Sequence, residues 1–323
     1  MASLDTLPAP QRDAVETALA AAFGATPGDI APLTEGGSTA FVYRVTHNGN
    51  RYLLRAEGEH SPLRNPHQYV SLRLAAEAGL APPLRYLDES SGVLVADFIA
   101  QQPLRAYPGG AEALARALGE IAARLREAPL FPYFTDYPAI VDRLFAHVVR
   151  TGLFAPGLLD PYTERLAAIV ARWRPARLVS AHNDLNPRNI LFDGTRLWLI
   201  DWESAYRGDP LIDVAVLLDN FAPTPALETA LLAGWGAQAD PAELADARAL
   251  TRLYYAGYFL SASATVPRTA HETDLSAPSA AQFLDGVEAG RFQPRTHDTI
   301  HTLGKLYLAS FMSGAPVPPL DAL

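Results

Sequence analysis

The fold is decided by a polar stretch in the second half of the chain, His182-Asn183-Asp184-Leu185-Asn186-Pro187-Arg188-Asn189, and by Asp201-Trp202-Glu203 a little further on. Between these stretches, residues 189–192 and 197–200 form two short, largely apolar runs, and Asp193-Gly194-Thr195 joins them. A glycine-containing turn between two such runs is typical of a tight β-hairpin. Closing this hairpin would bring Asn189 and Asp201 to the same end.

The order of these polar residues suits magnesium-assisted phosphoryl transfer. A loop aspartate such as Asp184 can accept the proton of an attacking hydroxyl group. Asn189 can bind one metal ion, and Asp201 can bind the ion that bridges the nucleotide phosphates, because Mg²⁺ prefers oxygen ligands. Each residue alone is more typical of a turn, so the prediction depends on the whole ordered set. A metal hydrolase with His182 and Asp184 as first ligands is an alternative, but the other histidines are scattered and no His-Glu-x-x-His motif occurs.

The composition of the 323 residues excludes several classes of protein. An apolar fraction of 49% is typical of a globular protein and too high for a disordered one. The net charge of −9 argues against nucleic acid as a partner. The chain has no cysteine and a single lysine, Lys305, which excludes thiolate chemistry and the Gly-Lys-Ser/Thr phosphate loop. No signal-peptide pattern or bilayer-spanning apolar run occurs, so we expect a cytoplasmic protein without a membrane partner.

The patterns along the chain predict a small antiparallel sheet followed by a mainly helical region. In the first region we expect a helix over 8–24, strands over 41–45 and 52–55, a helix from Asn65-Pro66 to Gly79, and strands over 86–88 and 93–95. In the second region we expect helices over 111–127, 137–150, 160–173, 241–263 and 296–312, with a surface loop over 264–295. The hairpin after the polar stretch interrupts this helical region.

The stretch 180–216 resembles the aminoglycoside phosphotransferase and choline kinase superfamily. Leu53-Leu54-Arg55, Gly79-Leu80-Ala81-Pro82-Pro83 and Ile200-Asp201-Trp202-Glu203 are most similar to its choline/ethanolamine kinase-like branch. The resemblance implies an α+β, two-lobed protein-kinase-like fold. Residues 1–97 would form a nucleotide-binding lobe with a small antiparallel β-sheet, and residues 98–323 a mainly helical lobe with the catalytic loop and the acceptor site. The implied activity is ATP- and Mg²⁺-dependent phosphorylation of the hydroxyl group of a small, cationic metabolite such as choline or ethanolamine.

The resemblance also assigns roles to individual residues. Asp184 would be the catalytic base, His182 would brace its loop, and Asn189 and Asp201 would bind Mg²⁺. The turn Gly36-Gly37-Ser38-Thr39 would cover the phosphates, because glycines let backbone N–H groups approach phosphate oxygens. Relatives often carry Asn where this chain has Ala40, so the resemblance does not carry over one side-chain contact of that loop to phosphate or to the loop itself.

Arg55 is expected to bind the nucleotide phosphates in place of the usual kinase lysine. A guanidinium group can hold two phosphate oxygens at once and does not deprotonate. The family normally anchors this cation with a helix carboxylate, but the matching position here is Gln68. Gln68 can accept a hydrogen bond from Arg55, but it carries no charge. Glu77 lies half a turn out of phase on the same predicted helix and does not replace it.

Two further groups of residues complete the expected site. Asp97-Phe98-Ile99 is expected at the junction of the lobes, where its backbone could bind adenine. The expected acceptor-binding residues are Glu203, Asp209, Tyr254 and Tyr258, whose carboxylates and rings would favour a cation. A tyrosine stripe with helical spacing is also typical of a core. We expect Asp213 to brace the catalytic loop.

Three other kinases of the same fold remain alternatives, which are those that act on aminoglycosides, homoserine or thiamine. A nucleotide-binding pseudokinase or regulatory protein is an alternative of another class. The uncharged Gln68 and Ala40 favour it, whereas the ordered set of Asp184, Asn189 and Asp201 argues against it. The sequence predicts no particular oligomeric state.

Overall fold

The computed structural model describes residues 4, 7–24, 27–33, 40–58 and 65–320. The expected phosphate-covering residues Gly36, Gly37, Ser38 and Thr39 lie outside the described residues. By its internal contacts the chain divides into two units. Unit 1 comprises Met1–Ala106 and Ile190–Tyr206, and unit 2 comprises Tyr107–Asn189 and Arg207–Leu323. The lobe boundary that we expect after residue 97 stays a prediction.

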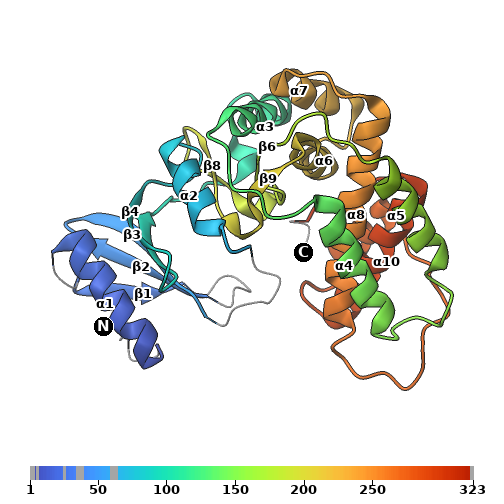
Figure 1. The fold of residues 1–323 in the computed structure, drawn as a ribbon, viewed down its shortest axis with the longest axis horizontal. Coiled ribbons are helices and arrows are strands. Elements are labelled where there is room, and N and C mark those ends of the chain that lie inside the picture. The colour runs from blue at the N-terminus through green and yellow to red at the C-terminus, as the bar shows by residue number, and fades with distance from the viewer. Residues whose placement is uncertain (1–3, 5–6, 25–26, 34–39, 59–64, 321–323) are drawn as a thin grey trace. The chain divides into compact units, whose positions relative to one another are not determined.

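Unit 1 contains a five-stranded antiparallel sheet of order β1-β2-β3-β5-β4 (Figure 1). Its strands are β1 (Asp29–Pro32), β2 (Phe41–His47), β3 (Asn50–Ala56), β4 (Leu84–Asp88) and β5 (Val93–Asp97). Both expected hairpins are therefore confirmed. The β2–β3 turn places Asn48 and Gly49 at φ 50° and 77°, the left-handed backbone that a two-residue hairpin of this twist requires.

Two helices cover the two faces of this sheet. Helix α1 (Ala9–Phe23) packs Val15 and Leu19 with Val93 and Val95 of β5 in one apolar cluster. Leu94, between them on the strand, packs instead with Tyr69 of helix α2 (Gln68–Glu77). This alternation follows from the period of two residues along a strand.

Helix α2 begins two residues later than the sequence predicts. Asn65 does not cap it: the Asn65 side chain accepts the N–H of His67 at 2.9 Å and donates to the carbonyl of Ala205 at 2.7 Å. Asn65-Pro66 therefore forms a turn that attaches the start of the helix to the 190–206 segment of the same unit. Helix α1 ends at Gly24 with φ 78°, as expected.

The hairpin after the polar stretch belongs to unit 1. Strands β7 (Ile190–Phe192) and β8 (Leu197–Leu199) pair in antiparallel register, with Ile190 opposite Leu199. The turn is held by Asp193, whose side chain accepts hydrogen bonds from Thr195, Arg196 and Trp198. Backbone hydrogen bonds from Leu199 to Leu80 and from Gln102 to Phe192 attach the hairpin to the rest of the unit.

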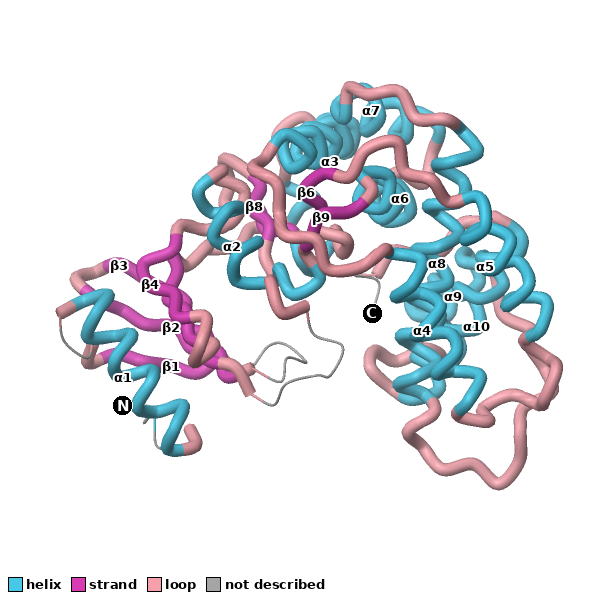
Figure 2. The backbone as a smooth tube through the Cα atoms, in the orientation of Figure 1, coloured by secondary structure: helices cyan, strands magenta, loops and turns pink. Residues whose placement is uncertain are grey.

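Apart from the short β6 (Val179–Ala181) and the last two residues of β9 (Tyr206–Gly208), the regular secondary structure of unit 2 is helical, as Figure 2 shows. Its helices are α3 (Gly110–Glu127), α4 (Tyr137–Arg150), α5 (Asp160–Arg172), α6 (Pro210–Phe221), α7 (Pro225–Trp235), α8 (Pro241–Ser263), α9 (Ala280–Glu288) and α10 (His297–Ser313). The five expected helices are confirmed. The sequence prediction of a loop over 264–295 is wrong for α9, which Ser279 and Gln282 begin with a capping box. Among the described residues, no helix is long and apolar enough to cross a membrane.

Helices α3 and α7 touch through glycine. A Cβ atom on Gly119 would lie 2.0 Å from the carbonyl oxygen of Leu231, and one on Gly234 would lie 2.0 Å from that of Arg116. Only glycine at these two positions permits so close a backbone approach. This contact fixes α7 against α3, and α3 also packs against α6.

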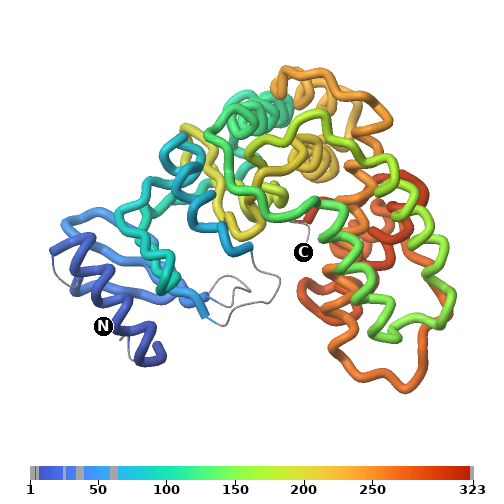
Figure 3. Tube along the Cα trace, viewed as in Figure 1, coloured from blue at the N-terminus to red at the C-terminus, as the bar shows by residue number. Residues whose placement is uncertain are grey.

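The segment between α8 and α9 is held by a partly buried polar cluster. Glu272 accepts hydrogen bonds from His301 and from Lys305 of α10, each at 2.7 Å, and Ser263 at the end of α8 lies 2.7 Å from the other ring nitrogen of His301. The single lysine of the chain therefore serves as a structural ion pair. Figure 3 shows the course of this segment, in orange, after the end of α8.

Candidate active site

The loop over residues 182–189 lies in unit 2 between β6 and a short 3-10 turn, Pro187–Asn189. Its entry is fixed by Asp213 of α6. The Asp213 carboxylate accepts the backbone N–H groups of His182 at 2.9 Å and of Asn183 at 2.7 Å. Asn183 has φ 63°, a left-handed conformation that asparagine tolerates better than most residues. The expected bracing role of Asp213 is confirmed.

Burial raises the pKa of two carboxyl groups at the start of α6. Asp213 is 3% exposed, and its burial raises its pKa to about 7 against the opposing effect of the two N–H donors. Asp209 is also buried, which raises its pKa to about 6, and its side chain caps α6 by accepting the N–H of Leu211 at 2.9 Å. Asp209 therefore has a structural role at the start of α6, and its predicted acceptor contact stays a prediction.

The carboxylate of Asp184 accepts hydrogen bonds on both oxygens. Oδ1 accepts from Nδ2 of Asn186 at 2.9 Å and from the hydroxyl of Tyr255 at 2.6 Å. Oδ2 accepts from Nδ2 of Asn189 at 3.1 Å, and the same nitrogen donates to the Asp184 carbonyl at 2.9 Å. Donors on both oxygens fix the orientation of the group, as the catalytic role predicted for it requires.

The two residues expected to bind metal carry the right atoms for a hard cation. Because Asn189 turns its amide nitrogen toward Asp184, its carbonyl oxygen is the end that a metal ion would meet. Asp201 is exposed and has φ 63°, an unusual conformation for a residue other than glycine. Among the described residues, no group of three or more His, Asp and Glu side chains is placed to hold a metal ion. The expected magnesium ligands Asn189 and Asp201 stay a prediction.

In unit 1 the structure changes the interpretation of Gln68. Nε2 of Gln68 donates to Oε1 of Glu57 at 2.6 Å, and both side chains are buried. The amide nitrogen of Gln68 thus donates to a carboxylate. The sequence instead predicts that the amide oxygen of Gln68 accepts a hydrogen bond from Arg55. Arg55 is half-buried on β3, and within the described residues its guanidinium group has no ion pair. Its guanidinium group is a cation that an anionic ligand could use.

The end of β5 was expected to bind adenine through its backbone. The N–H of Asp97 donates to the carbonyl of Pro83 at 2.9 Å, and that of Phe98 to the carbonyl of Arg51 at 3.2 Å. The Asp97 carboxylate is paired with Arg85 at 2.6 and 2.8 Å. An adenine contact at this segment would therefore involve its carbonyl groups or Ile99.

The expected acceptor residues differ in their exposure. Tyr258 of α8 is 58% exposed, and its ring lies edge-on to that of Phe259. Tyr254 is half-buried, and its ring contacts those of Tyr137 at 5.9 Å and Tyr255 at 5.4 Å. Glu203, in unit 1, is exposed on the 3-10 turn Trp202–Ser204. The tyrosine stripe is thus partly core and partly surface.

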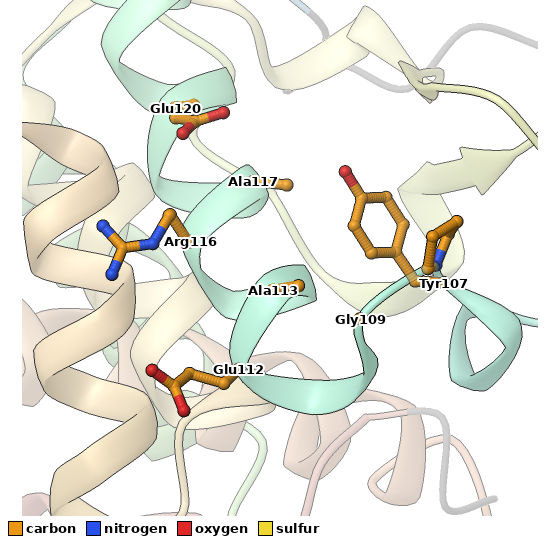
Figure 4. A pocket seen from close by; sticks show the side chains of 8 residues that line it. Tyr107, Gly109, Glu112, Ala113, Arg116, Ala117 and Glu120 are labelled. Carbon is orange, nitrogen blue, oxygen red and sulfur yellow. The ribbon is translucent and has the colours of Figure 1, made fainter.

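Helix α3 borders a hollow of about 470 Å³ in unit 2 that involves none of the expected site residues. Figure 4 shows the ring of Tyr107 facing Ala113 and Ala117 across it, with Arg116 pointing away. Glu112 and Glu120 are the acidic residues of its lining. This hollow adds nothing to the phosphate chemistry of the 182–189 loop.

Three residues of the site were missed by the sequence analysis. Tyr255 is next to Tyr254 on α8. The four-residue spacing of Tyr254 and Tyr258 predicts a shared helix face for the acceptor, but it gives no reason to expect that Tyr255 contacts Asp184. Asn186 stands two residues after Asp184, the separation at which an Asx side chain commonly bonds its own loop. Glu57 follows the end of β3 directly, two residues after Arg55.

Comparison with known proteins now adds to this geometry. The model of the phosphotransferase enzyme family matches residues 29–247, which is more than half of the chain. The chain belongs to the phosphotransferase enzyme family. The matched range of this phosphotransferase includes Arg55, the 182–189 loop and Asp201, so the family resemblance expected from these residues is confirmed.

Solved structures confirm the fold of the phosphotransferase. A choline/ethanolamine kinase family protein from Mesorhizobium loti has a TM-score of 0.59 at 22% identity, over 86% of this chain and 92% of that one. LicA in complex with AMP has a TM-score of 0.60 at 16% identity, over 93% of this chain and 98% of that one. The expected α+β, kinase-like fold is therefore confirmed.

Curated sequences match over short segments only. The chain is 47% identical to protein LicA of Haemophilus influenzae over 39 residues, which cover 12% of this chain and 15% of that protein. The phosphotransferase thus spans less than a fifth of the length of the curated relatives that it matches. Its acceptor has to be argued from its own residues.

Proposed function

We propose that this phosphotransferase transfers the γ-phosphoryl group of ATP to the hydroxyl group of a small, cationic metabolite, with an amino alcohol such as choline or ethanolamine as the acceptor. The observation that carries the proposal is the Asp184 carboxylate. It has side-chain donors on both oxygens, in a loop whose entry is fixed by the buried Asp213. Orientation of this kind is what a general base needs.

In the reaction, the acceptor oxygen forms a bond to the γ-phosphorus while the bond from phosphorus to the β–γ bridging oxygen breaks. Asp184 accepts the proton that the hydroxyl group loses as it attacks. Tight orientation of the base matters because the transition state is loose and the protein contributes mainly positioning and charge. His182, in the same loop, is fully buried and is proposed to brace it.

The nucleotide would be held by unit 1. The half-buried Arg55 is the cation proposed to bind two phosphate oxygens, and Gly36-Gly37-Ser38-Thr39 the turn proposed to cover them. Asp97-Phe98-Ile99 is the segment proposed to meet adenine. The relative LicA binds AMP, which supports an adenine nucleotide as the ligand.

Asn189 and Asp201 are proposed to hold Mg²⁺ through their oxygens. When bound, Mg²⁺ would neutralise phosphate charge during the transfer. Asn189 also donates to Asp184, so the same residue would link the metal site to the base.

The acceptor class is proposed from charge and aromatic side chains. The chain has a net charge of −9, and Tyr254 and Tyr258 offer ring faces for a cation. The choline/ethanolamine kinase family name of the Mesorhizobium loti relative points to the same class. Kinases of aminoglycosides, homoserine or thiamine are the alternatives within the fold.

The test is an acceptor panel. ADP formation from Mg-ATP is measured with choline, ethanolamine, aminoglycosides, homoserine and thiamine, with a reaction without acceptor as the blank. We expect the amino alcohols to have the highest kcat/KM. A higher kcat/KM for an aminoglycoside, homoserine or thiamine would contradict the proposed acceptor class but would still support phosphoryl transfer.

A nucleotide-binding protein without turnover is the competing function, and the uncharged Gln68 is the observation that favours it. The same panel separates the two. Binding of ATP without ADP formation for any acceptor would overturn the proposed activity.

A further inference from the structure

Tyr255 donates its hydroxyl to Oδ1 of Asp184 at 2.6 Å, across 71 positions of sequence. We propose that Tyr255 is a positioning residue that holds the general base in its reactive orientation. This inference rests on the proposed function, because it assigns Asp184 as the base. It adds a link from α8, which bears the proposed acceptor tyrosines, to the reacting carboxylate.

The origin of the donor distinguishes Tyr255 from the other partners of Asp184. Asn186 and Asn189 belong to the same short loop and move with it. Tyr255 comes from a separate helix, so its hydrogen bond fixes the carboxylate relative to the helical body of unit 2. A shift of α8 would therefore move the Tyr255 hydroxyl and change the orientation of the Asp184 carboxylate.

The ring of Tyr255 has little freedom to move away. It lies edge-on between the rings of Tyr254 at 5.4 Å and Tyr307 at 5.8 Å, and the residue is 7% exposed. Edge-to-face pairs at these distances are favourable beyond the area that they bury. The packing thus holds the hydroxyl in one direction, toward the carboxylate.

The Tyr255 hydroxyl is placed as a hydrogen-bond donor to the Asp184 carboxylate. Burial and the adjacent Asp184 charge raise its pKa well above 10, so it does not compete for the acceptor proton. A charge-assisted O–H···O hydrogen bond of this length is among the stronger kinds in proteins. These properties suit orientation of the base and exclude Tyr255 as a second base.

The experiment compares Tyr255→Phe with a matched control, Tyr307→Phe. Tyr307 belongs to the same ring cluster and is as deeply buried, but its hydroxyl donates to the carbonyl of Pro318 at 3.1 Å, far along the chain from the loop. Each variant loses one buried hydroxyl. We expect Tyr255→Phe to lower kcat about 10-fold with the KM for ATP changed less than about 2-fold, because misorientation affects the chemical step. Tyr307→Phe should keep kcat within about 2-fold.

A double-mutant cycle with Asp184→Asn tests whether Tyr255 acts through Asp184. In the Asp184→Asn background, Tyr255→Phe should cause no further loss of residual activity, whereas a merely structural effect would add to it. An additive loss, or a Tyr255→Phe enzyme as fast as the wild type, would overturn the inference and leave the kinase activity in place.

Urea unfolding of the same four proteins gives a readout independent of turnover. A non-additive shift of the midpoints is expected, since the two residues share one hydrogen bond. If the wild type turns over no acceptor, the proposed function fails and the positioning role fails with it, even where the midpoints show coupling. Additive midpoints in an active kinase would refute the contact itself.

Discussion

Arg252 binds Asp219 with two nearly parallel hydrogen bonds, from Nε to Oδ2 at 2.7 Å and from a terminal nitrogen to Oδ1 at 2.8 Å. The side chains are 4% and 6% exposed. Arg252 lies on α8 and Asp219 on α6, so this pair joins the helix that carries Tyr255 to the helix that carries Asp213. The two supports of the 182–189 loop are therefore locked to each other.

Breaking this pair should destabilise the fold strongly. In Asp219→Ala the buried Arg252 and the partly buried Arg248 both lose their carboxylate partner, and we expect the free energy of unfolding to fall by about 3–5 kcal/mol. Arg172→Ala is the control, because it breaks the exposed pair of Arg172 with Asp246 and should cost under about 1 kcal/mol. Urea unfolding measures both. Equal losses in the two variants would contradict the importance assigned to the buried pair.

The proposed metal ligand and the proposed base should differ in their effect on nucleotide binding. Asp201→Asn should abolish turnover and weaken the Mg²⁺-dependent part of ATP binding, because a charged oxygen ligand is lost. Asp184→Asn should lower kcat at least 100-fold and leave ATP affinity within about 2-fold, because the base acts on the acceptor. Calorimetry with a non-hydrolysable ATP analogue, with and without Mg²⁺, measures this. Equal loss of affinity in both variants would refute the assignment of roles.

The hydrogen bond between Gln68 and Glu57 makes Gln68→Glu a destabilising change, whereas the sequence alone predicts a favourable ion pair with Arg55. The sequence favours restored pairing with Arg55, but the structure would place two carboxylates at 2.6 Å in a buried site. We expect a loss of about 2 kcal/mol in the free energy of unfolding. The swapped double variant, Glu57→Gln with Gln68→Glu, should recover most of it, and Glu77→Gln on the exposed face of α2 should change little. A stable single variant with tighter ATP binding would show that Arg55 is the real partner.

The helices and hairpins that the sequence predicts are those with a clear local pattern of apolar and turn residues. The amphipathic α3 and α4 and the hairpin at Asp193-Gly194 have clear periods or turns, and they are where we expect them. Helix α6 is apolar along nearly its whole length, so no period marks it, and only Asp209-Pro210 signals its start. The 182–189 loop has no period of its own, and the order of its polar residues is what predicts it.

Long-range pairs escaped the sequence analysis because they depend on packing. The bond from Tyr255 to Asp184 needs the exact rotation of α8, which is set partly by Arg252 and Asp219. The bond from Gln68 to Glu57 needs α2 to begin at Gln68 and not at Pro66. Neither condition is encoded in a local motif.

The buried Asp213 should give the protein a stability that falls as pH rises from about 4 to about 7. Burial raises its pKa from 3.8 to about 7 in the folded state, so the folded protein binds more protons than the unfolded chain in this interval. Protons bound preferentially by the folded state stabilise it, and this contribution is full below pH 4 and lost above pH 7. Urea unfolding as a function of pH measures it.

Asp213→Asn isolates this contribution from those of other groups. Asp209 has a raised pKa and acts in the same direction, whereas His301, whose pKa is lowered by burial, acts in the opposite one. The difference between wild type and Asp213→Asn should therefore decline between pH 4 and pH 7 and stay constant above it. A difference independent of pH would mean that Asp213 is ionised in the fold throughout. The variant should also lower kcat, since asparagine offers one acceptor oxygen for the two N–H groups of His182 and Asn183.

The cationic preference can be tested with a pair of isosteres. Choline and 3,3-dimethylbutan-1-ol have the same shape and hydroxyl group, and only choline is charged. We expect choline to have the higher kcat/KM, because a net charge of −9 attracts it and the rings of Tyr254 and Tyr258 can bind a cation by about 1–2 kcal/mol where they are desolvated.

Two variations separate the ring contribution from the long-range field. Tyr258→Leu keeps an apolar side chain at this exposed position of α8, so it should raise the KM for choline about 2- to 5-fold, the size of a cation–π contribution at an exposed ring, and leave the neutral isostere almost unchanged. Raising the salt concentration from 0.05 to 0.5 M (about a threefold shorter Debye length) should weaken only the encounter with the cation. If the neutral alcohol is phosphorylated as well as choline, the acceptor is not selected by charge. The phosphotransfer chemistry of Asp184 would then still apply to a neutral substrate.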